Sequence, residues 1–218
     1  MATIAIPRRQ QAEERREQIL DAAQRVFCVK GFAGASVRDI AREAGITEGL
    51  IYHYFESKIQ LQEAVWKERS WRAQLQRILS EADGKSLEQV LREMVRDFLG
   101  TLRENGPMVR MCAAESQRDP ELAAEHLKHI QENQKLTSEF LAARKAAGES
   151  RPDAEMDVAA GLLMGCAYSC FLLFGNSDEG KWAEVVDSLT SSGVDTVMRG
   201  IAPKPKVCEL FHKGLDIV

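Results

Sequence analysis

The sequence has few of the residues that mark disulfide-rich or disordered proteins. Only five of its 218 residues are cysteine and six are proline. The first residues lack the apolar core of a signal peptide, and the cysteines show no disulfide-framework spacing. The hydrophobic share of 44% and the charged share of 28% are ordinary for a globular protein. We therefore expect a globular, cytoplasmic protein with reduced thiols.

The sequence also lacks the short motifs of common catalytic chemistry. It contains no glycine-rich phosphate loop, no nucleophile elbow, no paired cysteine motif and no acid/base pair at a defined spacing. We therefore expect no enzyme, no catalytic residue and no cofactor. Two pairs are spaced by about one helical turn, namely His126 with His129 and Cys166 with Cys170. A metal face or a redox switch is the alternative at these pairs, but exposed and packing roles are commoner, so we expect no metal site.

Charge is unevenly distributed along the chain. The formal net charge is -4. Residues 1–60 hold nine Lys/Arg and eight Asp/Glu, a net charge of +1, which leaves 20 against 25, or -5, for the rest. This balance argues against a protein that coats nucleic acid without specificity. It is compatible with a limited set of phosphate contacts made by the N-terminal part.

The stretch from 36 to 55 predicts two short helices joined at a glycine. Ser36 and Asp39 have the spacing of a capping box, and the apolar residues after Ser36 recur on one helical face. Gly45 stands where a helix end needs a left-handed residue, and Thr47 can cap the next helix. A connection this short is typical of a helix-turn-helix.

The second of these helices has an apolar face and a polar face. Leu50, Ile51 and Phe55 cluster on the inner side at 100° per residue. Such a pair of helices is also typical of a surface hairpin in an all-helical domain. The helix expected upstream at 13–27 and the cap expected at Ser57 favour a three-helix DNA-binding bundle followed by a fourth helix. The residues left facing outward are Glu48, Gly49, Tyr52, His53 and Glu56.

A longer pattern joins these positions. It consists of Gly31-Phe32, Ser-Val-Arg-Asp-Ile-Ala at 36–41, Ala44-Gly45-Ile46, Leu50-Ile51-Tyr52-His53-Tyr54-Phe55, Lys58 and Leu61. This pattern is nearly gapless over about residues 14 to 62, and it resembles the N-terminal domain of TetR-family transcriptional regulators. Beyond it, only the all-helical pattern and the stretch 114–122 look similar to members of that family.

The resemblance implies which residues contact DNA. It implies base contacts for Thr47, Glu48, Gly49 and Tyr52, and phosphate contacts for Arg38, Tyr54 and Lys58, with the second helix in the major groove. Periodicity places Tyr54 on the inner side, so we expect its ring to pack while its hydroxyl reaches the DNA backbone. His53 projects outward and is a further candidate contact, with a solvated histidine as the alternative.

The remaining sequence predicts an all-α fold with a head and a larger body. Further helices are expected at 57–82, 87–103, near 108–112, and at 120–148, 152–174 and 178–200. Residues 14–60 form the expected helix-turn-helix head, and residues 61–202 form the expected effector-binding and dimerisation body. Residues 1–13 are expected to form a flexible basic arm, in which Arg8 and Arg9 either reach DNA or stay in solvent. Residues 203–218 form a C-terminal tail.

Residues 158–174 contain no charged side chain. This length is at the bottom of the range for a membrane span, and the many small residues favour a helix surrounded by protein. We expect a homodimer formed around residues 153–200, because one small domain supplies too little cover for so apolar a helix. The alternative is a core made by one chain alone. No membrane partner is expected.

The resemblance also implies a mechanism. Family members usually repress transcription as dimers on pseudo-palindromic operator DNA and release it when a small molecule binds the body. We therefore expect a repressor with an unidentified small apolar or amphipathic effector. A helical adaptor that binds only protein is the alternative function. Ten mostly apolar residues of the body are expected to line the effector pocket, although plain core packing is the alternative for each. They are Trp66, Met94, Phe98, Leu102, Met108, Met111, Cys112, Met164, Tyr168 and Phe171.

Overall fold

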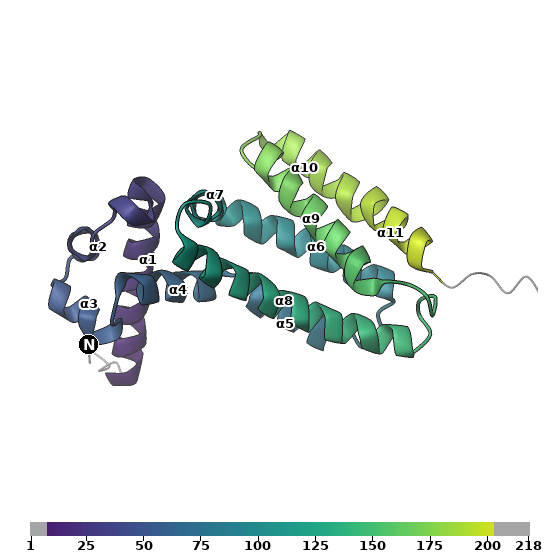
Figure 1. The fold of residues 1–218 in the computed structure, drawn as a ribbon, viewed down its shortest axis with the longest axis horizontal. Coiled ribbons are helices and arrows are strands. Elements are labelled where there is room, and N and C mark those ends of the chain that lie inside the picture. The colour runs from purple at the N-terminus through teal and green to yellow at the C-terminus, as the bar shows by residue number, and fades with distance from the viewer. Residues whose placement is uncertain (1–7, 203–218) are drawn as a thin grey trace, which may run out of the picture. The chain divides into compact units, whose positions relative to one another are not determined.

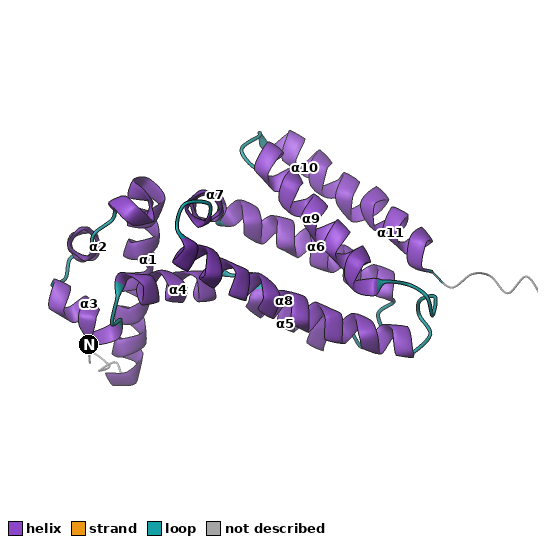
Figure 2. Ribbon diagram, in the orientation of Figure 1, coloured by secondary structure: helices purple, strands orange, loops and turns teal. Residues whose placement is uncertain are grey.

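The computed structural model describes residues 8–202, where it contains helices joined by short loops and no strand (Figures 1 and 2). The all-α expectation is confirmed. The N-terminal half contains α1 (Arg8–Gly34), α2 (Val37–Ala44), α3 (Glu48–Tyr54), α4 (Lys58–Arg69), α5 (Arg72–Ser80) and α6 (Leu87–Glu104). After it come α7 (Gly106–Ser116), α8 (Pro120–Ala146), α9 (Met156–Phe174), α10 (Glu179–Ser188), the π-helix η1 (Leu189–Gly193) and α11 (Val194–Ile201).

The sequence predicts a flexible arm at 1–13 and a C-terminal tail at 203–218. Helix α1 begins at Arg8, so the part of the expected arm from 8 to 13 is helical and that part of the expectation is wrong. The rest of the arm and the expected tail at 203–218 lie outside the described residues.

The chain divides into two compact units. The first unit contains residues up to Leu75 together with Gly100–Asn133, and the second contains Gln76–Leu99 together with the residues from Gln134 onward. The first unit therefore holds more than the expected head, because α7 and the beginning of α8 belong to the same compact body. The expected division between residues 60 and 61 stays a prediction.

The first unit is built around α1, which packs against α2, α4 and α7. Ile19 and Phe27 of α1, Ile40 of α2 and Ile51 of α3 are almost completely buried in one hydrophobic cluster. Burying each such side chain contributes about 1.5–3 kcal/mol. The short helices α2 and α3 are therefore held by their inner faces, and their outer faces stay free.

The helix caps expected from the sequence are present. The Ser36 hydroxyl accepts a hydrogen bond from the Asp39 amide at 3.1 Å, and the Asp39 carboxylate accepts one from the Ser36 amide at 3.2 Å. Gly45 ends α2 with a φ of 66°. Thr47 and Ser57 cap α3 and α4 through their hydroxyls. These caps fix the turn between α2 and α3.

The helix expected at 57–82 is interrupted. Ser70 adopts an extended conformation, and its hydroxyl donates to the carbonyl of Lys67 at 3.1 Å. The Trp71 side chain that follows is only 6% exposed. The apolar pattern continues through this break and therefore does not reveal it.

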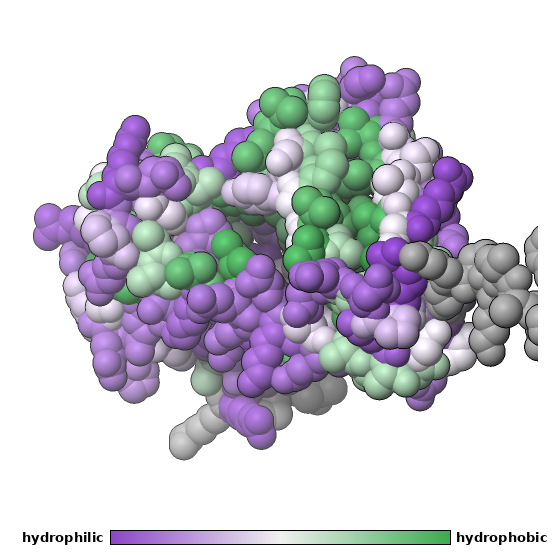
Figure 3. Space-filling view, turned by 45° about the vertical axis from the view of Figure 1, so that its right-hand side comes forward, coloured by the Kyte–Doolittle hydropathy of each residue, from purple (hydrophilic) through white to green (hydrophobic). Residues whose placement is uncertain are grey.

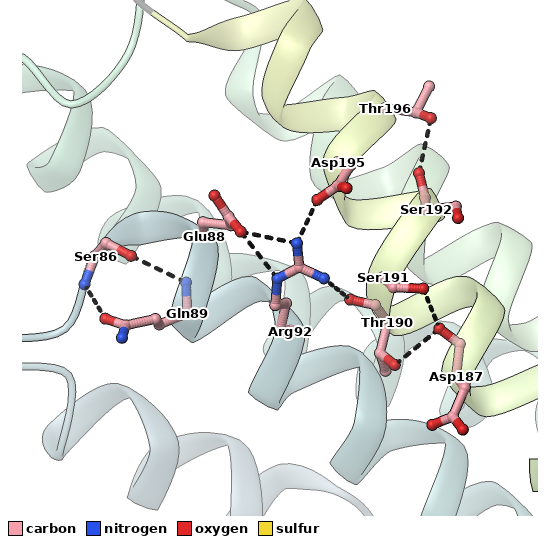
Figure 4. A network of polar contacts seen from close by, with 10 residues as sticks. All are labelled: Ser86, Glu88, Gln89, Arg92, Asp187, Thr190, Ser191, Ser192, Asp195 and Thr196. Carbon is pink, nitrogen blue, oxygen red and sulfur yellow. Dashed lines mark hydrogen bonds and ion pairs between the residues drawn. The ribbon is translucent and has the colours of Figure 1, made fainter.

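In the second unit the helix expected at 178–200 is also interrupted, by η1 (Figure 4). The Thr190 hydroxyl donates to the carbonyl of Val186 at 2.7 Å, and the Thr190 carbonyl accepts from Nη1 of Arg92 at 2.5 Å. Arg92 lies on α6 and also binds the carboxylates of Glu88 and Asp195. The π-turn thus presents a backbone carbonyl to an arginine on a neighbouring helix.

Helix α1 bends at Gly31, where φ is 70° and ψ is 167°. This backbone conformation is essentially restricted to glycine. A Cβ atom at this position would lie 3.0 Å from Oε1 of Glu115 on α7. At Gly45, where φ is 66°, a Cβ would meet no atom within 4 Å.

The two glycines give a matched pair of substitutions. We predict that Gly31→Ala lowers the free energy of unfolding by about 3 kcal/mol, because it combines a glycine-only conformation with a carboxylate contact. Gly45→Ala should cost about 1 kcal/mol, because a left-handed helical conformation is its only penalty. Urea denaturation followed by circular dichroism measures both. Equal losses would contradict the close contact with Glu115.

Candidate nucleic-acid interface

The outer face of α3 is exposed, while the inner face is buried. Ile51 is 1% exposed and Tyr52, the next residue, is 52% exposed. Thr47, Gly49 and His53 are exposed too. A Cβ at Gly49 would meet nothing within 4 Å, so another surface has room to approach closely there. These positions lie on the outer face as the sequence predicted; their contacts with DNA stay predictions.

The first residue of α3 and the second residue of α2 form an ion pair. Nε of Arg38 donates to Oε1 of Glu48 at 3.1 Å, and the Arg38 side chain is 82% exposed. Glu48 is half-exposed. The arginine expected at a phosphate and the glutamate expected at a base therefore lie in contact with each other.

Other cations near α2 are paired with carboxylates. Lys30 and Arg42 both bind the Asp39 carboxylate, at 2.7 Å and 2.6 Å. Hydrogen bonds from Lys30 and Ser36 hold the pKa of Asp39 well below its usual range. Binding of a phosphate by these cations therefore requires exchange of one anion for another.

Tyr54 and Lys58 face the interior of the first unit. Tyr54 is half-buried against the hydrophobic cluster, with its ring edge-to-face with His53 at 5.4 Å. The Lys58 ammonium donates to the carbonyls of Phe32 and Ala35 at 2.8 Å and 2.9 Å. Burial lowers the pKa of Lys58, and the Glu115 carboxylate partly opposes that effect. A phosphate contact by Lys58 would require the ammonium to leave both carbonyls.

The residues expected to line an effector pocket are divided between the two units. Trp66, Leu102, Met108, Met111 and Cys112 belong to the first unit, and Met94, Phe98, Met164, Tyr168 and Phe171 belong to the second. Most of them are buried, and the others are half-buried. Plain core packing accounts for these positions as well as a pocket does.

Near Trp66 the first unit contains polar groups that the apolar pattern did not reveal. Gln62 is 2% exposed, and beyond the Cys112 thiol its amide has no hydrogen-bond partner within the described chain. The indole N–H of Trp66 also has no partner there beyond that thiol. Burial raises the pKa of the adjacent Cys112 thiol, against smaller opposing effects of Trp66 and Gln62. The sequence signal that could have revealed this polar cluster is Gln62, a polar residue one helical turn before Trp66 on the inner face of α4.

His126 and His129 pack against the same tryptophan. Their rings lie 4.9 Å and 5.6 Å from the Trp66 ring, both edge-to-face. Burial lowers the pKa of both histidines. In the part of the chain that the structure describes, no group of three or more possible metal ligands gathers. The two histidines therefore pack around Trp66.

In the second unit α9 is covered on one side only. Met156, Leu163 and Phe171 point into the chain, whereas Leu162 is 68% exposed and Leu173 is 76% exposed. Hydrophobic side chains gather on the visible surface of this unit (Figure 3). By length and composition α9 is apolar enough to span a membrane, and only 22% of its most apolar window is buried. One such helix is weak evidence for a membrane protein.

Comparison with known proteins identifies the family. A family model described as bacterial regulatory proteins of the tetR family matches residues 19–65. A second, described as the tetracyclin repressor-like C-terminal domain, matches residues 81–189, which is half of the chain. The chain belongs to the TetR family. It is therefore a transcriptional regulator with a DNA-binding helix-turn-helix, which α2 and α3 form.

Similar TetR-family regulators differ in how much of their length is matched. UidR from Escherichia coli is 29% identical over 163 residues, covering 72% of this chain and 80% of UidR. SrpR from Pseudomonas putida is 42% identical over 59 residues, covering 27% of this chain and 28% of SrpR. The chain thus spans only 28% of the length of SrpR.

Solved structures share the TetR-family fold. A regulator from Mesorhizobium loti has a TM-score of 0.72 and 19% identity, covering 88% of this chain and 98% of that chain. GusR from Salmonella enterica has a TM-score of 0.69 and 24% identity, covering 85% and 94%. FadR from Bacillus subtilis, solved with stearoyl-CoA, has a TM-score of 0.65 and 19% identity, covering 80% and 97%.

The inward orientation of Lys58 has a measurable consequence. We predict that Lys58→Met lowers the free energy of unfolding by about 1–3 kcal/mol, because two carbonyls at the end of α1 lose a charged donor. Lys67→Met is the matched control, because Lys67 is an exposed lysine on the same helix. Thermal unfolding measures stability, and DNA titration over several salt concentrations measures phosphate contacts. Unchanged stability with a salt slope reduced by about one would show that Lys58 binds phosphate instead.

Proposed function

We propose that this TetR-family regulator is a cytoplasmic repressor. As a homodimer it binds a pseudo-palindromic operator, and a small molecule bound in its body releases it. The observation that carries the DNA-binding part is the exposed outer face of α3, with Tyr52 at its centre and Ile51 buried behind it. One head reads few base pairs, so two heads about one helical turn of DNA apart, or a multiple of that, are needed for specific binding.

The dimer part of the proposal is supported by α9. Its exposed side has large apolar side chains at Val158, Leu162 and Leu173. Between them, Gly161 and Gly165 have no atom within 4 Å of a built Cβ, so a second helix has room to approach closely. A symmetric pairing of α9, with α10 and α11 beside it, covers this apolar surface with the same surface of a second copy.

The effector part is supported by the cluster around Trp66. The buried polar groups of Gln62 and Trp66, which find only a thiol as partner within the described residues, lie beside a cavity of about 10 Å³. The cavity is also lined by Ile59, Leu122, Glu63 and Glu125. Buried polar groups without partners are uncommon and call for a ligand, a water molecule or a rearrangement. A cavity of this size has room for about one water molecule, so an effector there requires the surrounding side chains to move apart. The similar FadR was solved with an amphipathic molecule, stearoyl-CoA. Release requires that the effector bind more tightly to the conformation that cannot bind DNA than to the conformation that can.

A duplex selected from a random-sequence pool by the full-length protein tests the DNA-binding function. We expect sequence-specific retention in a gel shift, weakened about five- to 150-fold by Tyr52→Ala, the range expected for a base contact. Val29→Ala on α1 is the control, because Val29 is 84% exposed outside the helix-turn-helix. Circular dichroism checks that both variants fold. A folded wild-type protein that retains no duplex would contradict the proposal and favour a protein-binding adaptor.

The oligomeric state of α9 variants tests whether the exposed side of α9 forms the dimer interface. We predict that Leu162→Glu produces monomers, because a buried unpaired carboxylate costs about 3 kcal/mol or more, roughly a hundredfold in Kd. Leu127→Glu on α8 is the matched control, because Leu127 is 52% exposed and lies in the first unit. Sedimentation equilibrium measures the mass. A wild-type monomer, or a Leu162→Glu variant that stays dimeric, would contradict the proposed interface.

A further inference from the structure

Cys166 and Cys170 lie one helical turn apart on α9, and the proposed function gives neither of them a role. Cys166 is exposed and Cys170 is half-buried. Their side chains are in hydrogen-bond contact, and burial together with the Cys166 thiol raises the pKa of Cys170. Cys28 is half-buried and Cys112 is buried, and burial raises the pKa of both thiols. Among the described cysteines, Cys166 is therefore the most accessible thiol.

Cys166 also lies at the middle of the exposed side of α9. Val158 and Leu173, the outer large apolar residues of that side, are 54% and 76% exposed. Cys166 follows the first by eight residues and precedes the second by seven. In an antiparallel pair of helices related by a two-fold axis, only a residue at the middle meets its own copy. A pairing that covers the whole exposed side therefore brings Cys166 next to Cys166 of the partner subunit.

The glycines of α9 allow the two helices to come close enough for a disulfide, which needs Cα atoms about 4.4–6.8 Å apart. A spacing of about 100° per residue puts Cys166 on the flank of the exposed side, roughly 60–80° from its middle. With Cα atoms about 2.3 Å from each helix axis and the axes about 8 Å apart, the two Cα atoms lie about 6–7 Å apart. Gly161 and Gly165, which have no atom within 4 Å of a built Cβ, permit this short axis distance.

Cys170 is a poorer disulfide partner than the second Cys166. Side chains four residues apart on one helix keep their Cβ atoms about 5–6 Å apart, whereas a disulfide needs about 3.5–4.5 Å. This distance disfavours a bond between Cys166 and Cys170 of one chain. In the antiparallel pair, Cys170 lies about 6 Å along the helix from the middle, so the two copies of Cys170 are about 12 Å apart.

We propose that a peroxide oxidises Cys166 and that the product is a disulfide between the Cys166 residues of the two subunits. This inference rests on the proposed dimer. The thiolate of a dissociated subunit, where Cys166 is exposed, attacks the O–O bond of hydrogen peroxide, and a sulfenic acid and a water molecule form. When the dimer forms again, the thiolate of the partner's Cys166 attacks that sulfur, the S–S bond forms and a second water molecule leaves. The two thiols are oxidised and the peroxide is reduced to water.

The disulfide changes how the regulator responds to dilution. A reversible dimer dissociates at low concentration, whereas a covalent link keeps the two subunits at a high effective concentration. Because specific operator binding needs two heads, the oxidised protein keeps binding at concentrations where the reduced protein has become monomeric. In the cytoplasm, where structural disulfides are rare, such a bond serves as a transient redox signal.

The test uses the full-length protein, reduced, freed of reductant and treated with equimolar hydrogen peroxide. After the remaining thiols are alkylated, non-reducing gel electrophoresis measures the covalent dimer, and mass spectrometry identifies the linked peptides. We expect the wild-type protein to give a dimer linked through two copies of Cys166, and Cys166→Ser to give none. Cys170→Ser is the matched control one turn away and should still be linked. Cys208→Ser should be linked too, and it controls for a cysteine outside the described residues.

Two further measurements separate a built contact from random collision. Leu162→Glu keeps the Cys166 thiol but should lose the covalent dimer, because its subunits no longer pair. Sedimentation equilibrium in reductant should show that Cys166→Ser remains a dimer, so that this variant removes the bond and leaves the interface. In a dilution series of the gel shift, the oxidised wild-type protein should retain the operator at concentrations about tenfold or more below the limit of the reduced protein.

Four results would overturn the proposal. The first is a wild-type dimer that peroxide leaves without a covalent link, and the second is a link that persists in Cys166→Ser. The third is a link of equal yield in Leu162→Glu, which identifies random collision. The fourth is operator binding that falls equally on dilution with and without the link. A wild-type monomer in reductant would overturn the proposed dimer as well, and this measurement separates that failure from the other four.

Discussion

The burial of α2 and α3 against α1 is the constraint on which the DNA-binding surface depends. Ile40 and Ile51 enter the same hydrophobic cluster as Phe27, so each short helix has only one orientation that covers its apolar side. Neither helix is long enough to be stable in isolation. Because their inner faces pack against α1, their outer faces are exposed. The caps at Ser36 and Thr47 set the turn between the two helices. The exposed Tyr52 is a consequence of the buried Ile51.

Contacts outside the helix-turn-helix also hold the end of α1 in the first unit. Glu115 of α7 lies against Gly31 of α1, and Lys58 of α4 binds the carbonyls that follow Gly31. Helices α1, α4 and α7 therefore meet where α1 ends. The polar cluster of Gln62 and Trp66 lies on the same helix as Lys58. A change in the position of α4 would act on both places, so in the proposed function α4 connects the effector site to the DNA-binding head.

Local signals predicted the fold better than they predicted the contacts of long side chains. The helix-turn-helix could be located from the sequence because capping boxes and a left-handed glycine act within a few residues. The break at Ser70 and the π-turn at Thr190 could not, because nothing local marks them: Trp71 is buried directly after the first, and the second is bound by Arg92 of a distant helix. Lys58 was expected to face DNA because of its place in the motif, and only the fold brings the end of α1 to its ammonium. The exposed side of α9 is assigned to a second chain only in the proposed function, because a single chain does not contain its partner.

Entry of the outer face of α3 into DNA can be followed by amide hydrogen exchange of the full-length protein, with and without its selected operator duplex. We expect the duplex to slow exchange in α2 and α3, over residues 37–54, and a scrambled duplex to do so far less. Slowed exchange confined to α9, or exchange in α3 that a tightly bound duplex leaves unchanged, would contradict the entry of α3 into DNA.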